Sequence, residues 1–183
     1  LPHVHAAEDN TLRLALIGCG GRGTGAVANA FEAKGGPVKL VAMSDVNEQK
    51  LNTSFQTLSK ENATQMDVSP DRRFLGFDAY RKAIDCLRPG DVALLTTHSA
   101  FRATHLAYAI EKGVHVFMEK AFAPDPGGIQ HILQLGEAAD RKNLKIGCGL
   151  MCRHSSARRE LIQKIRDGAL GDIQLIRAYR MDQ

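Results

Sequence analysis

Short apolar runs alternate with longer amphipathic stretches along most of this chain. The runs at 12–18 and 38–45 are mostly apolar, which is typical of strands that are buried on both faces. The stretches at 23–35 and 126–143 repeat apolar residues three and four positions apart, as one face of a helix does. The alternation predicts parallel β-α-β units and therefore an α/β fold with a doubly wound parallel sheet.

Applied to the whole chain, the pattern predicts strands and helices in regular succession. The expected strands are 12–18, 38–45, a short one within 72–77, 91–97, 114–119 and 144–150. The expected helices are 23–35, 46–60, 78–87, 103–113, 126–143 and 155–168. Gly and polar residues mark the loops between them.

The pattern changes near residue 150. Segment 172–181 alternates apolar and polar residues, as a strand with one exposed face does. We therefore expect a doubly wound domain at 12–150 and a second domain that begins at 151–183. The second would be an α/β domain with an open, mainly antiparallel sheet, of which this chain holds only the start.

Composition narrows the functional classes. The 183 residues carry a net charge of +4, with 5% aromatic residues and no Trp, which argues against a nucleic-acid stacking surface. No apolar run reaches about 18 residues, so no membrane span is expected. The four cysteines lack zinc-ligand spacing, and no metal site is expected.

The N-terminal segment 1–11 has two interpretations. Val4-His5-Ala6 and His5-Ala6-Ala7 are small-residue patterns like the end of a secretion signal. The alternative is a disordered leader.

A glycine-rich turn follows the first expected strand. Gly18, Gly20 and Gly23 match G-x-G-x-x-G between a strand and a helix. In that context the first glycine allows a sharp turn, the second lets a pyrophosphate approach the backbone, and the third lets the helix pack on the strand. The helix N-terminus would face the phosphate charge, with Gly21 and Arg22 completing the turn. The alternative is a tight turn without a ligand.

Asp45 ends the second expected strand, 22 residues after Gly23. A carboxylate there accepts hydrogen bonds from ribose hydroxyls and repels a 2′-phosphate, so NAD is expected rather than NADP. Arg22 weakens this expected preference, because its guanidinium could bind a phosphate. As an alternative, the Arg22 side chain could simply be solvated. As an alternative, Asp45 could simply cap the following helix.

Further candidates follow the later strands. Thr97 and His98 come after strand 91–97, and Glu119 and Lys120 end strand 114–119. Ligands of open α/β sheets bind at this carboxyl edge, so His98 is a candidate acid/base group or ribose contact. The structural alternatives are a hydrogen-bonded His98 and, for Lys120, an ion pair with Glu119 or a plain surface position.

Arg153 and His154 follow the last expected strand of the first domain. They are candidate substrate contacts, because a guanidinium suits a carboxylate or a pair of hydroxyls.

The combination resembles the Gfo/Idh/MocA oxidoreductases. The stretches "LRLALIGCGGRGTGA", "LVAMSDVN", "HLAYAIEKGVHVFMEK" and "RRELIQKIRDGALGDI" carry the resemblance. It implies a Rossmann domain, NAD(P)-dependent chemistry on a sugar or polyol hydroxyl, and a homo-oligomer at full length. It also implies that Lys120 lies beside the nicotinamide and the reacting hydroxyl, with Glu119 near the nicotinamide ribose. Exported members often carry twin-arginine signals, which favours a periplasmic location.

The sequence departs from the family pattern at two places. Ala121 stands where the family has the proline of Glu-Lys-Pro, and Thr97-His98-Ser99 stands where Thr-Pro-Pro is common. The family's acid/base Asp and His belong to the second domain, and no matching segment occurs here. We therefore predict cofactor binding without sugar oxidation by this chain. The alternatives are an NAD-dependent glycosidase and a non-catalytic dinucleotide-binding protein.

Overall fold

The computed structural model describes residues 10–179. Segment 1–9, which holds the pattern of a secretion signal, lies outside the described residues, as does 180–183. The chain divides into two compact units, Leu1–Gly149 and Leu150–Gln183. The assignment of the second unit to a substrate domain stays a prediction.

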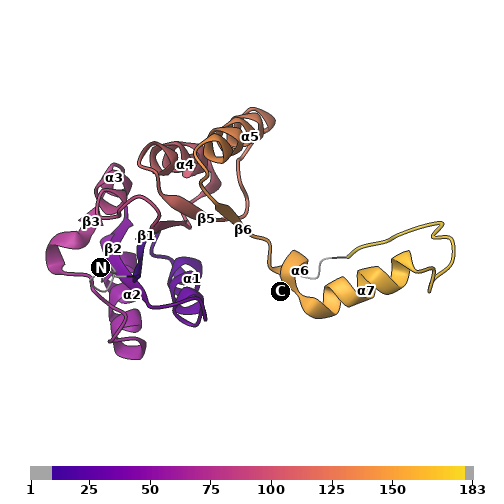
Figure 1. Ribbon diagram of the computed structural model, residues 1–183, viewed down its shortest axis with the longest axis horizontal. Coiled ribbons are helices and arrows are strands. Elements are labelled where there is room, and N and C mark those ends of the chain that lie inside the picture. The colour runs from indigo at the N-terminus through magenta and orange to yellow at the C-terminus, as the bar shows by residue number, and fades with distance from the viewer. Residues whose placement is uncertain (1–9, 180–183) are drawn as a thin grey trace, which may run out of the picture. The chain divides into compact units, whose positions relative to one another are not determined.

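The first unit is built on a six-stranded parallel sheet (Figure 1). The strand order is β3-β2-β1-β4-β5-β6, so the chain reverses its direction across the sheet between β1 and β4. Their bounds are β1 Leu12–Ile17, β2 Val38–Asp45, β3 Arg73–Leu75, β4 Val92–Leu95, β5 His115–Glu119 and β6 Ile146–Gly149. In such sheets ligands bind outside the carboxyl ends of the strands at the point of reversal.

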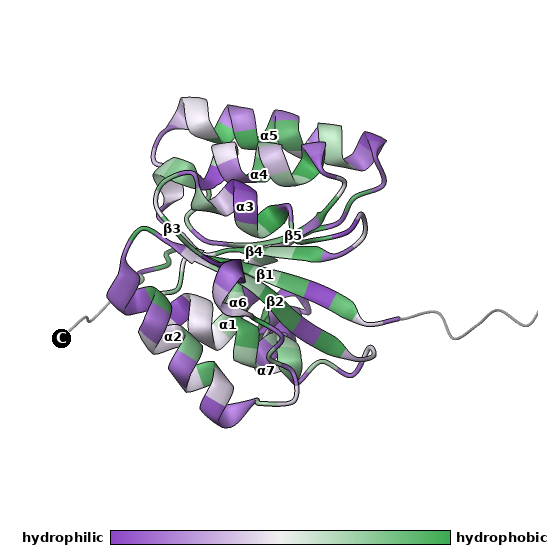
Figure 2. Ribbon diagram, turned by 90° about the vertical axis from the view of Figure 1, so that its left-hand side faces the viewer, coloured by the Kyte–Doolittle hydropathy of each residue, from purple (hydrophilic) through white to green (hydrophobic). Residues whose placement is uncertain are grey.

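Helices cover both faces of this sheet (Figure 2). One face carries α1 (Gly21–Phe31) and α2 (Glu48–Glu61). The other carries α3 (Ala79–Ile84), α4 (Arg102–Glu111) and α5 (Pro126–Arg141). The predicted doubly wound Rossmann sheet is thus confirmed.

Burial on two faces explains the continuous apolar strands. In β1, Leu14 and Leu16 pack in the cluster that includes Val27 of α1, whereas Ala15 and Ile17 pack in the opposite cluster. Neighbouring residues of a strand point to opposite faces, so every position of a central strand meets a helix layer. Both core clusters therefore draw on β1.

The helices begin in two different ways. Asn47 caps α2 by accepting a hydrogen bond from the Lys50 backbone N–H at 2.9 Å, and Asp125 caps α5 through Gly128 N–H at 2.8 Å. Helix α1 begins after Gly20 without any side-chain cap. The first backbone N–H groups of α1 are therefore left without a partner in the helix.

The second unit contains two helices, α6 (Met151–His154) and α7 (Ser156–Arg166). No residue of its described part is buried. The strand predicted at 172–181 is wrong for 172–179, which form no regular secondary structure, and the rest of it lies outside the described residues. A strand needs a neighbour to pair its backbone groups, and the described part of this unit contains no other strand.

Across residues 10–179, none of the helices combines the length and the apolar character that a membrane crossing requires.

Candidate functional site

Two glycines of the turn after β1 are required by the protein's own packing. Gly18 has a φ of +100°, and a Cβ there would lie 2.8 Å from the Thr97 backbone nitrogen. A Cβ on Gly23 would overlap the Gly18 carbonyl oxygen and lie 2.6 Å from Thr96 Oγ1. These contacts bring β1, α1 and the end of β4 close together, so neither position tolerates a side chain.

Gly20 and Gly21 are different. Gly20 has an ordinary φ of −72°, and a Cβ on either glycine would meet no atom within 4 Å. Neither backbone conformation nor internal packing therefore explains the missing side chain at Gly20. The open space lies at the uncapped N-terminus of α1, where backbone N–H groups and the helix dipole favour an anion. The residues present thus fit a dinucleotide pyrophosphate.

Asp45 links the end of β2 to this turn. Its Oδ2 accepts a hydrogen bond from Cys19 N–H at 2.6 Å, and its Oδ1 accepts one from Asn47 N–H at 2.8 Å. A carboxylate offers about four acceptor positions, so the group can still accept ribose hydroxyls. The alternative role of Asp45 as the helix cap is wrong, because Asn47 caps α2.

An open cleft lies at the carboxyl ends of β1, β2 and β4. It brings together five predicted site residues: Gly18, Gly20, Asp45, Thr97 and His98. Its wall also includes two exposed aromatic residues, Phe77 and Phe101, whose ring centroids lie 6.0 Å apart. Sequence reasoning missed this pair, although single exposed aromatic residues in loops after strands are a usable signal.

His98 has a local structural role. Its Nδ1 accepts a hydrogen bond from Ala100 N–H at 3.3 Å and caps the short turn Ser99–Phe101. That bond assigns the ring proton to Nε2 in the neutral side chain. The predicted contact of His98 with ribose or a reacting group stays a prediction.

His105 is a buried member of the cleft wall that the sequence did not single out for function. Its Nδ1 lies 3.3 Å from Thr97 Oγ1, and its ring lies 4.2 Å from that of Tyr80. Burial, followed by the positive charge of Arg102, lowers the pKa of His105 to about 4. The side chain is therefore neutral at neutral pH.

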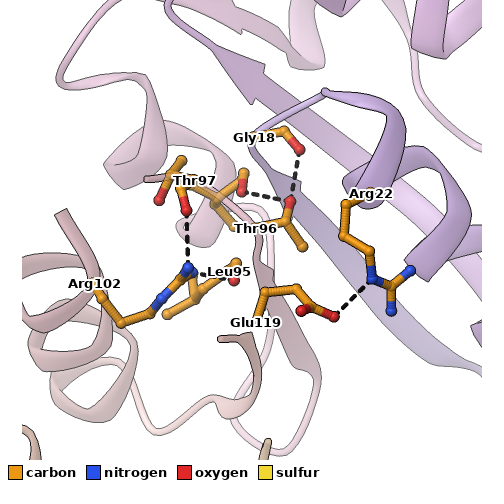
Figure 3. Close-up of polar contacts among 8 residues, drawn as sticks. Gly18, Arg22, Leu95, Thr96, Thr97, Arg102 and Glu119 are labelled. Carbon is orange, nitrogen blue, oxygen red and sulfur yellow. Dashed lines mark hydrogen bonds and ion pairs between the residues drawn. The ribbon is translucent and has the colours of Figure 1, made fainter. Parts of the chain in front are cut away.

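Glu119 forms its ion pair with Arg22 (Figure 3). Arg22 Nε donates to Glu119 Oε1 at 2.7 Å, joining the glycine turn to the end of β5. Glu119 is 7% exposed, and a Cβ on Gly149 would overlap its carboxylate. The alternative in which Glu119 pairs with Lys120 is thus wrong, and Arg22 is not simply solvated.

Lys120 follows β5 directly and is exposed, and its peptide bond to Ala121 is cis. Across the described ranges Lys120 forms no ion pair. Arg153 and His154 lie in α6 of the second unit, where both are exposed. The roles predicted for these three residues stay predictions.

Residues 12–149 match the family model described as "Oxidoreductase family, NAD-binding Rossmann fold". The chain belongs to the Gfo/Idh/MocA oxidoreductase family. The resemblance seen in the sequence is therefore confirmed, and NAD, the predicted cofactor, is the one named for the family.

A curated relative in this comparison is an inositol dehydrogenase. An inositol 2-dehydrogenase/D-chiro-inositol 3-dehydrogenase of Halalkalibacterium halodurans is 30% identical over 91% of this chain and 43% of its own length. The chain thus spans less than half the length of that relative.

Two solved structures share the fold. The myo-inositol 2-dehydrogenase of Lactobacillus plantarum has a TM-score of 0.68 at 23% identity, over 89% of this chain and 43% of its own. The scyllo-inositol dehydrogenase of Lactobacillus casei, solved with NAD(H) and scyllo-inositol, has a TM-score of 0.63 at 22% identity, over 88% and 43%.

Proposed function

We propose that this chain is the dinucleotide-binding part of an NAD-dependent oxidoreductase that acts on a hydroxyl of a sugar or polyol. The observation that carries the proposal is the open space at Gly20 and Gly21, which internal packing does not explain. It lies beside Asp45, whose carboxylate retains acceptor capacity. Membership in an oxidoreductase family with an NAD-binding fold supports the cofactor.

Each part of the cofactor has a candidate partner. The first backbone N–H groups of α1, at Gly21 and Arg22, would hold the pyrophosphate, and Asp45 would accept the adenosine ribose hydroxyls. Thr97 and His98 would contact the cofactor from the loop after β4. Glu119, held by Arg22, would lie near the nicotinamide ribose, as the family resemblance implies.

When bound, NAD supplies a hydride acceptor. Lys120 is exposed at the carboxyl edge of the sheet, where its ammonium group could donate a hydrogen bond to the reacting hydroxyl and orient it. Arg153 could hold a second hydroxyl or a carboxylate of the substrate. The proton of the reacting hydroxyl would go to the acid/base Asp or His that the family resemblance implies.

The substrate class that we propose is a cyclic polyol or sugar. The inositol dehydrogenases among the relatives support it. We further propose that the full-length protein is a homo-oligomer.

Gly20→Val tests the site. The branched side chain would occupy the pyrophosphate's space, so we expect the Kd for NAD, measured by titration calorimetry, to rise on the order of a hundredfold. Circular dichroism should show an intact fold, because no atom lies near the substituted Cβ. Gly35→Val is the matched control, since Gly35 has equally open surroundings but lies outside the cleft.

If folded Gly20→Val binds NAD as tightly as the unchanged chain, the proposed cradle is wrong. The reaction is tested separately by following NADH absorbance with inositols, hexoses and uronic acids. We expect binding without net reduction by this chain. Turnover that Lys120→Ala abolishes would instead show that the chain holds the whole acid/base machinery.

A further inference from the structure

Arg102 is a buried charged side chain whose hydrogen bonding is incomplete. It opens α4, is only 1% exposed, and is the largest nearly inaccessible side chain of residues 10–179. Its Nε is buried without a partner among those residues. A buried charge with incomplete hydrogen bonding is usually less stabilising than a well-packed apolar side chain. Stability alone therefore does not explain why an arginine occupies this position.

The guanidinium of Arg102 organises the end of β4 (Figure 3). It donates to the Leu95 carbonyl oxygen, and its Nη2 donates to the Thr97 carbonyl oxygen at 2.8 Å. These two carbonyls flank Thr96. The planar guanidinium offers its N–H groups to both carbonyls in a fixed fork, whereas a lysine ammonium presents its three donors from a single freely rotating nitrogen.

Thr96 transmits this arrangement to the glycine turn. Its single hydroxyl proton is donated to the Gly18 carbonyl oxygen at 2.6 Å, and the Ile17 carbonyl oxygen, at 3.1 Å, can share that proton. A continuous series of hydrogen bonds and peptide units therefore connects α4, through residues 95–97 at the end of β4, with the glycine turn after β1. Arg102 itself is absent from the cleft wall, whereas Gly18, Thr96 and Thr97 belong to it.

Among the described residues, the guanidinium of Arg102 bonds to carbonyl oxygens and not to a carboxylate. Burial lowers its pKa, and the charge of Glu119 opposes that effect. Glu119 is itself paired with Arg22 at 2.7 Å. The cation is thus held mainly by carbonyl oxygens of the β4 loop, which ties the geometry of that loop to the guanidinium.

We propose that Arg102 is a positioning residue for the dinucleotide site, which holds segment 95–97, at the end of β4, against the glycine turn. The inference rests on the proposed function, because it assumes that NAD binds in this cleft. Arg102 acts through Thr96 and Thr97 and does not touch the cofactor. Loss of the fork would loosen the wall formed by Thr97 without removing any cofactor contact.

The test measures NAD affinity in Arg102→Met and Arg102→Lys by titration calorimetry. We expect the Kd to rise on the order of tenfold for Arg102→Met, because both carbonyls lose a charged donor. Arg102→Lys should give a smaller rise, since its ammonium keeps the charge but lacks the fork. Leu106→Ala is the matched control, because Leu106 is fully buried on the same helix but outside the cleft.

Leu106→Ala should lower the melting temperature and leave the Kd unchanged, which separates positioning from general loss of stability. An unchanged Kd in folded Arg102→Met would overturn the inference. If that variant does not fold, an unchanged Kd in Arg102→Lys would overturn it instead. Failure of the unchanged chain to bind NAD would overturn the proposed function itself.

Thr96→Val supplies an independent check through a double-mutant cycle with Arg102→Lys. If Arg102 acts through the β4 loop, the two effects on NAD binding should be non-additive. Additive effects would show that the two residues act separately and would overturn the inference.

Discussion

The Asp45 carboxylate accepts backbone hydrogen bonds from Cys19 and Asn47, which hold it rigidly at the edge of the cleft. A fixed negative charge there would face the 2′-phosphate of NADP. We expect NAD to bind about ten- to a hundredfold more tightly than NADP, equivalent to about 1–3 kcal/mol. Titration calorimetry with both cofactors measures the ratio, and Asp45→Asn should reduce it while keeping two acceptor positions.

Asp140→Asn is the control, because Asp140 is exposed at the end of α5. The cofactor preference should stay unchanged in this variant. Equal affinity of the unchanged chain for the two cofactors would contradict the role given to Asp45.

His105 makes stability depend on pH. Its pKa falls from 6.5 to about 4 on folding, through burial and then the charge of Arg102. Between these values the unfolded chain binds a proton that the folded chain does not, so stability is lost as the pH falls from 6.5 to about 4. The titration of His105 lowers the free energy of unfolding by about 3 kcal/mol at most across this pH range. Urea unfolding of His105→Phe should show a correspondingly shallower loss across this window than the unchanged chain.

His131→Gln controls for an exposed histidine, since His131 lies on the surface of α5. It should retain the full pH dependence. If His105→Phe and the unchanged chain lose stability in parallel, folding does not lower the pKa of His105.

At the scale of elements, Gly23 lets α1 start directly against β1 and β4. We expect Gly23→Ala to destabilise the protein by at least about 3 kcal/mol, because backbone atoms of Gly18 would have to move. Chemical denaturation followed by circular dichroism measures the change.

Gly25→Ala is the matched control on the same helix. Its Cβ would meet only Arg22 Nη1, at an ordinary 3.5 Å, and alanine favours a helix by up to about 1 kcal/mol over glycine. This variant should therefore be as stable as the unchanged chain, or more so. A Gly23→Ala protein of normal stability would show that the turn can rearrange.

At the scale of the whole molecule, the two units differ in what holds them together. The first has core clusters on both faces of its sheet, whereas the described part of the second has no buried residue. Helix α7 has 11 residues, and Leu161 and Leu170 in and after it are 56% and 66% exposed. An isolated helix of this length is marginally stable in water.

We therefore expect backbone amides of α7 to exchange with deuterium at least about a hundredfold faster than those of β1, because α7 can open without opening the core. Hydrogen exchange followed by mass spectrometry measures both segments in one sample. Equal protection of α7 and β1 would show that the second unit is stabilised by contacts beyond those within α6 and α7.

The sequence by itself determined the elements and their order in the first unit. Strands such as 12–17 and 38–45 are recognisable because burial on both faces requires continuous apolar residues. The glycine turn and Asp45 could be placed at one edge for a similar reason, since parallel strands end on the same side of a sheet. Both predictions succeed because periodicity and strand order can be read from residues that are close together in the chain.

Only the tertiary structure decided the partners of the charged groups. Arg22 and Glu119 are 97 residues apart in the chain, so the ion pair between them exists only in the folded protein. Segment 172–179 has the alternation of a strand but no neighbour to pair with in the described residues. Pairing and burial depend on segments that are distant in the chain, so periodicity alone could not predict them.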